Sequence, residues 1–153
     1  ADSGLIGRSI GNLPLINVAS PAYLAEFGTP LHPDELGGHR AVRYASPSTG
    51  RIEDWEWCDD GSVHTRALAG NVIVNSAEAY IACCLVGLGL IQIPAYDVKD
   101  HLAAGDLVEV MPAHRAEPMT ITLLYPHRHN VTRRLEVFID WLEPLLKREL
   151  LPS

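Results

Sequence analysis

A stretch near the N-terminus with clear signals for the start and end of a helix constrains the fold of this chain more than any other feature. Leu13–Ala19 is a short apolar run typical of a strand. Ser20 is a favoured helix N-cap, and Pro21 suits the first helical position because its missing N–H is not needed there. Gly28 can take the left-handed conformation that ends a helix. These residues predict a strand followed directly by a helix over Pro21–Phe27.

The same kind of start and stop signals recurs immediately afterwards. Pro33 restarts a helix with Asp34 and Glu35 in its first turn, where the helix dipole favours anions. Gly37-Gly38 then stops it. Strands and helices alternate in this way through most of the chain, which predicts an α/β fold.

The other elements are predicted from periodicity and from turn residues. The predicted strands are Leu5–Ile10, Leu13–Ala19, Arg40–Ala45, Trp55–Asp59, Val63–Leu68, Asn71–Asn75, Leu90–Pro94, Leu107–Met111 and Met119–Tyr125. The predicted helices are Pro21–Phe27, Pro33–Leu36, Ser76–Val86, Ala95–Ala104 and Val131–Lys147. Asp60-Gly61 predicts the turn of a hairpin in the middle of the chain.

Two of the helices carry further information. Asn75 and Glu78 stand at capping-box spacing, which predicts Asn75 as the N-cap of the helix that Gly87 ends. The last helix has a long apolar stripe, formed by Val131, Leu135, Phe138, Ile139, Leu142, Leu145 and Leu146. Few strands of the chain remain to cover this stripe, so we expect a partner from upstream sequence or from another subunit.

Composition excludes several classes of protein. A chain of 153 residues makes one domain or a pair of small lobes, and no apolar run reaches the roughly 18–20 residues of a membrane helix. The net charge is −7, and the basic cluster of His127-Arg128-His129 with Arg133-Arg134 reads as a solvated face, so this chain alone should not bind DNA. Cys58 and the adjacent Cys83 and Cys84 form no disulfide framework and fit a reducing cytoplasm.

The sequence supports catalysis or metal binding less well than it supports binding of a ligand. Cys83 and Cys84 lie in an apolar helix, where thiols are usually inert. His114, His127 and His129 lack the spacing of a metal site, and the glycine patterns of phosphate and dinucleotide loops are absent. We therefore predict no catalytic residue, no metal and no cofactor.

Ordered motifs along nearly the whole chain resemble the effector-binding domain of LysR-type transcriptional regulators. The motifs are Leu15-Ile16-Asn17-Val18-Ala19-Ser20-Pro21-Ala22-Tyr23-Leu24, Pro33-Asp34-Glu35-Leu36 with His39-Arg40, Asn71-Val72-Ile73-Val74-Asn75-Ser76-Ala77-Glu78-Ala79, and Gly87-Leu88-Gly89-Leu90-Ile91-Gln92-Ile93-Pro94. Each motif is weak alone, but their order and spacing are specific.

The resemblance implies a type-2 periplasmic-binding-protein-like α/β fold, with one complete lobe and part of the second joined by two crossover strands. Residues 1–18 would end the first lobe and form the first crossover strand. Residues 19–118 would form the second lobe, and residues 119–153 the return strand and a helix that packs on the first lobe. The family's winged helix-turn-helix, its linker helix and most of the first lobe would precede Asp2.

The resemblance also implies a partner, and the residues suggest where it binds. The partner would be a small-molecule effector, by family analogy often a carboxylate, while DNA would be bound only by the absent helix-turn-helix of a cytoplasmic homo-oligomer. Helix N-termini attract anions, and ligands of α/β folds lie at the carboxyl ends of strands. We expect Ser20, Asn75 and Ser76 to bind the polar end of the effector, and Ile93, Pro94 and Tyr96 to wall it, with Pro21 at the first of these N-termini.

Two alternatives stay open at this point. Ser20 and Asn75 can be helix caps and nothing more. The chain can also be a stand-alone solute-binding module of the same fold, in which case it should carry a secretion signal and two complete lobes.

Overall fold

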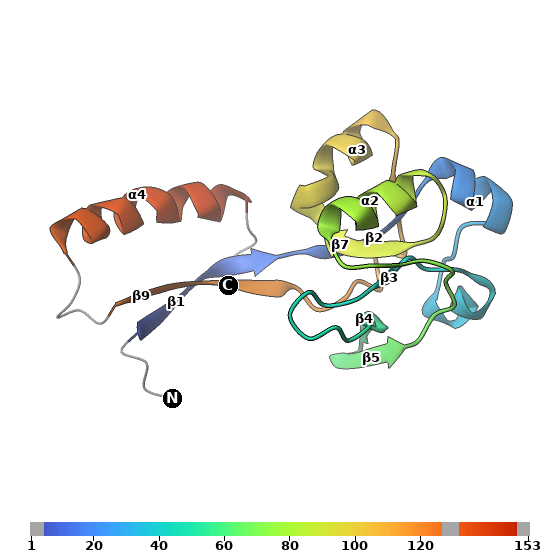
Figure 1. The fold of residues 1–153 in the computed structure, drawn as a ribbon, viewed down its shortest axis with the longest axis horizontal. Coiled ribbons are helices and arrows are strands. Elements are labelled where there is room, and N and C mark those ends of the chain that lie inside the picture. The colour runs from blue at the N-terminus through green and yellow to red at the C-terminus, as the bar shows by residue number, and fades with distance from the viewer. Residues whose placement is uncertain (1–4, 127–131, 150–153) are drawn as a thin grey trace. The chain divides into compact units, whose positions relative to one another are not determined.

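The computed structural model describes residues 5–126 and 132–149, and the chain divides into two compact units (Figure 1). Unit 1 is formed by Ala1–Pro14 together with Pro118–Ser153, and unit 2 by Leu15–Glu117. The chain therefore enters unit 2 after Pro14 and leaves it before Pro118.

The elements follow one another in the alternating order expected of an α/β chain. In chain order they are β1 (Leu5–Leu13), β2 (Leu15–Ala19), α1 (Pro21–Phe27), η1 (Pro33–Gly38), β3 (Arg43–Tyr44), β4 (Trp55–Asp59), β5 (Ser62–Arg66), β6 (Ile73–Val74), α2 (Ala77–Leu85), β7 (Ile91–Pro94), η2 (Ala95–Val98), α3 (Lys99–Ala104), β8 (Val108–Val110), β9 (Met119–Pro126) and α4 (Arg133–Glu149).

Unit 1 is built on an antiparallel pair of long strands. β1 pairs with β9 from Leu5 opposite Pro126 to Leu13 opposite Met119. α4 packs against β1, and the Arg8 guanidinium Nε lies 2.9 Å from a carboxylate oxygen of Glu143. The pairing places the two segments that connect the units side by side at their unit 1 ends.

Pro14 corrects the prediction of one strand over Leu13–Ala19. Proline has no N–H to give to a sheet ladder, so the strand is interrupted there. β1 runs on past the predicted end at Ile10 and stops at Leu13, and β2 begins at Leu15 in the sheet of unit 2. The two halves of the predicted strand thus belong to different units.

The centre of unit 2 is a three-stranded antiparallel sheet in the order β7-β2-β8. α2 packs on β2 and β7. The apolar cluster between them is formed by Ile16, Val18, Val42, Tyr80, Cys84, Ile91, Ile93, Val98 and Leu107. A second cluster is formed by Ala19, Tyr23, Leu36, Ala41, Trp55, Leu68, Leu90, Val110 and Met111.

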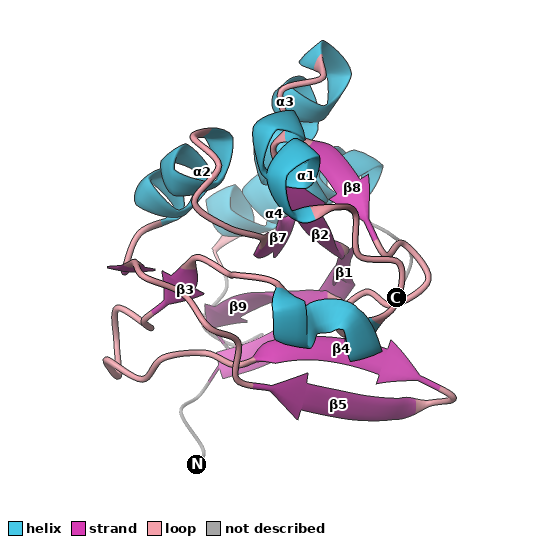
Figure 2. Cartoon of the chain, turned by 90° about the vertical axis from the view of Figure 1, so that its right-hand side faces the viewer, coloured by secondary structure: helices cyan, strands magenta, loops and turns pink. Residues whose placement is uncertain are grey.

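The rest of unit 2 surrounds this sheet. β3 pairs with β6 in parallel, and single bridges join Ala41 to Leu90 and Arg40 to Ala69. The β4–β5 hairpin turns at Asp60 and Gly61 as predicted, both with positive φ (48° and 77°), and lies at the end of the unit away from α3 (Figure 2). The predicted strand over Arg40–Ala45 is thus mostly single bridges, because Ala69, Leu90, β6 and Ile52 each pair with it at a different point.

The helix boundaries were predicted well in the first part of the chain and less well later. α1 has the predicted bounds: Ser20 Oγ accepts a hydrogen bond from Tyr23 N at 3.2 Å, and Gly28 ends the helix at φ 83°. The predicted helix over Ala95–Ala104 is a 3₁₀ turn, η2, followed by α3. The helix predicted over Pro33–Leu36 is likewise 3₁₀ throughout. It includes Gly37 and Gly38, which were predicted to stop it, and ends at His39.

The predicted apolar stripe of α4 is only partly covered. Ile139 is buried at 7% exposure, Leu135, Leu142, Leu145 and Leu146 are half-buried, and Phe138 is 51% exposed. Trp141, which was not predicted as part of the stripe, is 61% exposed. Val131, predicted as the first member of the stripe, lies outside the described residues, as do His127 and His129. No helix in the described part of the chain is long and apolar enough to span a membrane.

Candidate functional site

The N-terminus of α2 is capped by Ser76 rather than by the predicted Asn75. Ser76 has extended backbone angles (φ −138°, ψ 151°), and its Oγ accepts a hydrogen bond from Ala79 N at 3.2 Å. Glu78 lies in the first turn, and Asn75 and Ser76 are both exposed. The capping-box prediction is wrong by one position, because two adjacent residues can both serve as caps and the backbone selects the second.

The apolar residues expected to wall the effector lie at the end of β7 (Ile93 and Pro94) and in η2 (Tyr96). Pro94 pairs with Leu15 at the start of β2 and is half-buried. Ile93 is only 2% exposed and belongs to the core of unit 2. Tyr96 is 48% exposed, and the ammonium of Lys99 lies 4.5 Å from its ring centroid.

Tyr80 connects the start of α2 to β7. It lies one helical turn after Ser76, and its hydroxyl accepts a hydrogen bond from Gln92 N at 3.0 Å. Burial raises the pKa of Tyr80, so the hydroxyl is neutral and remains a hydrogen-bonding group. Since Gln92 lies two residues before Pro94, the N-terminus of α2 and the end of β7 lie at the same end of unit 2.

Ser20 and Pro21 lie at the opposite end of α2. A Cβ placed on Gly87, just past the end of the helix, would lie 3.6 Å from Ser20 Oγ. At a rise of about 1.5 Å per residue, the helix separates Gly87 from Ser76 by about 16 Å. The structure therefore does not bring Ser20 together with Asn75 and Ser76, and one small ligand does not reach both ends.

Ser20 serves unit 2 as a buried cap. Its side chain is 2% exposed, and its hydrogen bond goes to the first turn of α1. Pro21 is the first residue of that helix, where proline is favoured. These contacts account for both residues without a ligand.

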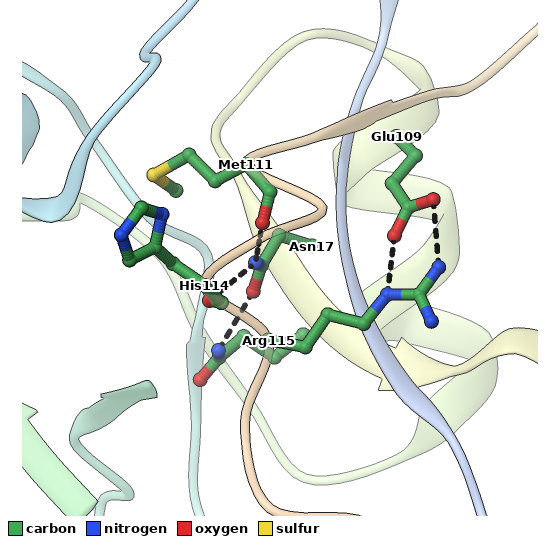
Figure 3. Close-up of polar contacts among 6 residues, drawn as sticks. Asn17, Glu109, Met111, His114 and Arg115 are labelled. Atoms are coloured by element: carbon green, nitrogen blue, oxygen red, sulfur yellow. Dashed lines mark hydrogen bonds and ion pairs between the residues drawn. The ribbon is translucent and has the colours of Figure 1, made fainter. Parts of the chain in front are cut away.

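A buried amide that the sequence interpretation passed over lies at the centre of unit 2. Asn17 in β2 is fully buried, and its Nδ2 donates to the carbonyls of Met111 (3.4 Å) and His114 (3.1 Å), as Figure 3 shows. Its Oδ1 accepts from Gln92 Nε2 at 2.8 Å. The sequence carried one sign of this site, a single asparagine within the apolar run Leu15–Ala19, where an unpaired amide would be costly.

The same region holds a surface ion pair. Arg115 makes two hydrogen bonds to the carboxylate of Glu109, at 2.8 and 3.0 Å (Figure 3). These bonds raise the pKa of Arg115, which stays charged. The Arg115 side chain is 42% exposed and that of Glu109 26%, so water screens the pair in part.

Two of the three thiols of the chain, Cys84 and Cys58, have raised pKa values. Burial raises the pKa of Cys84 to about 12, and its Sγ donates to Val18 O at 3.6 Å. Burial and the nearby carboxylates of Glu56 and Glu117 also raise the pKa of Cys58. A thiol with a raised pKa is a poor nucleophile at neutral pH. Among the described residues, no group of three or more metal-ligating side chains comes together.

Comparison with known proteins identifies the family. The model of the LysR substrate binding domain family matches residues 1–147, and the chain belongs to this family. The chain is 40% identical over 149 residues to the HTH-type transcriptional regulator YhjC of Escherichia coli, covering 97% of this chain and 50% of that protein. It is 28% identical to the HTH-type transcriptional regulator CrgA of Neisseria meningitidis, covering 92% of this chain and 46% of that protein.

Solved structures confirm the fold. The full-length virulence activator AphB of Vibrio cholerae, a member of the same regulator family, superposes with a TM-score of 0.79 at 27% identity, over 95% of this chain and 49% of that chain. The regulatory domain of CrgA superposes with a TM-score of 0.76 at 27% identity, over 95% of this chain and 70% of that domain. The predicted type-2 periplasmic-binding-protein-like fold is therefore confirmed, and the chain spans about half the length of the full-length relatives.

Proposed function

We propose that this chain is the effector-sensing part of a LysR-type transcriptional regulator. The observation that carries the proposal is the family match over residues 1–147, which leaves almost no part of the chain to another role. The named relatives are HTH-type regulators, which favours this function over a stand-alone solute receptor. The family is one of regulator domains rather than of enzymes, and we assign no catalytic residue.

We place the effector at the N-terminus of α2. Asn75 and Ser76 would bind its polar end, and Pro94 and Tyr96 would contact its apolar part, with Ile93 in the core beneath. Free backbone N–H groups and the positive end of the helix dipole favour an anion there, so a carboxylate is the expected group. The ammonium of Lys99 beside Tyr96 adds positive charge at the same end of unit 2.

In the whole regulator, the effector would act by binding two arrangements of the lobes with different affinity. Residues 19–118 would serve as the second lobe, while residues 1–18 and 119–153 would connect it to the first lobe. DNA contact would come from a helix-turn-helix outside this chain, in a cytoplasmic homo-oligomer. The −7 charge of the chain agrees with that division of roles.

A binding experiment with a matched control tests the site. Acetate, lactate, succinate and benzoate are each titrated calorimetrically into the protein that contains residues 1–153. Three forms are compared: the wild type, Ser76→Leu and Ser62→Leu. Ser62 is exposed in β5, so the same substitution there controls for an added apolar side chain. We expect Ser76→Leu to lose binding of whichever carboxylate the wild type binds, and Ser62→Leu to keep it.

The outcomes separate the parts of the proposal. Loss of the cap should cost about 0.5–2 kcal/mol of unfolding free energy, which leaves the unit folded. Unchanged carboxylate affinity in Ser76→Leu would overturn the site. Absence of binding for all four carboxylates in the wild type would overturn the proposed ligand class.

A further inference from the structure

The hydrogen-bonding groups of the buried Asn17 side chain are paired within unit 2. Asn17 is 0% exposed, and its amide nitrogen donates to the carbonyls of Met111 and His114 while its oxygen accepts from Gln92. Burying an amide costs free energy unless hydrogen bonds replace those to water. A polar residue in the middle of β2 is therefore tolerated only because these partners are held in place.

The first two partners belong to a strained turn. Met111 has φ 47°, a left-handed conformation that residues other than glycine rarely adopt. Such a conformation persists when surrounding contacts determine it. His114 N donates to Met111 O at 2.9 Å, and Asn17 binds the carbonyl at each end of this turn. Asn17 thus holds the segment that leads out of unit 2.

Gln92 extends the same set of bonds to the last residue of the unit. Its side chain donates to Glu56 O at 2.7 Å and accepts from Glu56 N at 3.0 Å. A carboxylate oxygen of Glu56 then accepts from Glu117 N at 3.0 Å. Cys58 N also donates to Arg115 O at 2.9 Å, so the outgoing segment is bound along β4.

These bonds reach both points at which the chain changes unit. Asn17 lies three residues after Pro14 on the incoming segment, and Glu117 directly precedes Pro118 on the outgoing one. On the other side of the two prolines, the β1–β9 ladder begins at once with Leu13 opposite Met119. Neither proline has an N–H with which to continue a ladder.

We infer that Asn17 and Gln92 are a positioning pair that fixes both connecting segments at the edge of unit 2 and so confines bending between the units to Pro14 and Pro118. The positioning role follows from the hydrogen bonds alone. Only its use, a change of lobe angle on effector binding, rests on the proposed function. The pair would make unit 2 turn as one body, because its two connections cannot loosen separately.

Hydrogen–deuterium exchange of the whole 153-residue chain tests the inference without any effector. The variants are Asn17→Leu and Gln92→Met, which break the pair from its two sides with apolar side chains of similar size, and Asn71→Leu as a matched control on an exposed asparagine. In both pair variants, the amides of Cys58, His114 and Glu117, each of which donates one of these hydrogen bonds, should exchange at least about tenfold faster than in the wild type.

Which amides exchange faster decides between a positioning role and a general loss of stability. Amides of α2 should keep their wild-type protection in Gln92→Met, and Asn71→Leu should match the wild type throughout. Equal acceleration over all of unit 2 would mean a loss of general stability and would overturn the positioning role, as would unchanged protection of the His114 and Glu117 amides. Because no ligand is used, failure here is distinct from failure to bind a carboxylate.

Discussion

At the scale of single residues, one hydroxyl links α1 to the two residues that follow η1. Tyr23 is 1% exposed; its OH accepts from Arg40 N at 2.9 Å and lies 2.7 Å from His39 Nδ1. The imidazole tautomer decides which atom donates in the Tyr23–His39 hydrogen bond, because the hydroxyl oxygen can both donate and accept. In either tautomer, the hydroxyl links α1 to His39 and to the backbone of Arg40.

Tyr23→Phe should lower the unfolding free energy by about 1–3 kcal/mol, because it leaves Arg40 N–H and His39 Nδ1 without their partner. Urea unfolding followed by circular dichroism measures the loss. Tyr96→Phe is the control, since Tyr96 is exposed and outside both core clusters. An equal loss in the two variants would contradict the role of the buried hydroxyl.

The same histidine makes stability depend on pH. Burial lowers the pKa of His39 below its usual 6.5, and Glu35 opposes this only in part. The unfolded chain therefore binds more protons than the folded one, so stability rises with pH and falls as the pH drops through about 6.5. Unfolding free energies measured from pH 8 to pH 5.5 should decrease, and His39→Gln should flatten that part of the curve. An unchanged slope in the variant would rule out His39 as the source.

At the scale of elements, two glycines allow neighbouring backbone segments of unit 2 to pack closely against Ala41. A Cβ on Gly89 would lie 2.7 Å from Ala41 C and Val42 N, and a Cβ on Gly70 would clash with Ala41 O. Both neighbours are backbone atoms, which cannot move aside as a side chain can. The bridges of Ala41 to Leu90 and of Arg40 to Ala69 require this close approach.

Gly89→Ala should therefore destabilise the chain by about 1–3 kcal/mol, as overpacking does in a filled core. Gly38→Ala is the control, because a Cβ added there would meet no atom within 4 Å and the φ of Gly38 is not positive. Thermal unfolding of the two variants in parallel measures the difference. A Gly89→Ala variant as stable as Gly38→Ala would mean that the bridge around Ala41 is not required.

The elements that sequence predicted best are those decided within a few residues. Ser20, Gly28 and the Asp60-Gly61 turn each act on neighbours within three or four positions, and all three have the predicted role. The N-cap of α2 was missed by one position because Asn75 and Ser76 are both good caps, and only the backbone path separates them.

What sequence could not supply was the direction in which elements pack. Ser20 and Ser76 both precede helices and follow strands, yet they lie at opposite ends of α2. Asn17 and Gln92 are separated by 75 positions, and their hydrogen bond exists only once β2 and β7 are paired. The fold class was therefore predictable, whereas the grouping of polar residues required tertiary structure.

At the scale of the whole molecule, burial is divided unequally between the units. Both core clusters belong to unit 2, whereas Ile10 and Ile139 are the buried apolar side chains in the described part of unit 1. Apolar burial supplies most of the free energy that offsets conformational entropy. Unit 1 should thus be the less stable unit of this chain.

Amides of α4 should lose protection at a lower urea concentration than amides of α2 when exchange is measured in increasing urea. The expected order follows from the exposed Val137, Phe138 and Trp141 in α4 and the buried Tyr80 and Cys84 in α2. Loss of protection at one common urea concentration would show instead that the two units unfold together.

The exposed indole of α4 gives the chain a built-in optical reporter. Trp141 belongs to unit 1 and is 61% exposed, while the other two tryptophans, Trp55 and Trp57, belong to unit 2, where Trp55 is 5% exposed. Iodide should quench the fluorescence of Trp141 and leave that of Trp55 almost unchanged. Binding of any surface over α4 would then shift the emission of Trp141 to shorter wavelength and reduce its quenching by iodide. This can be measured without adding a label.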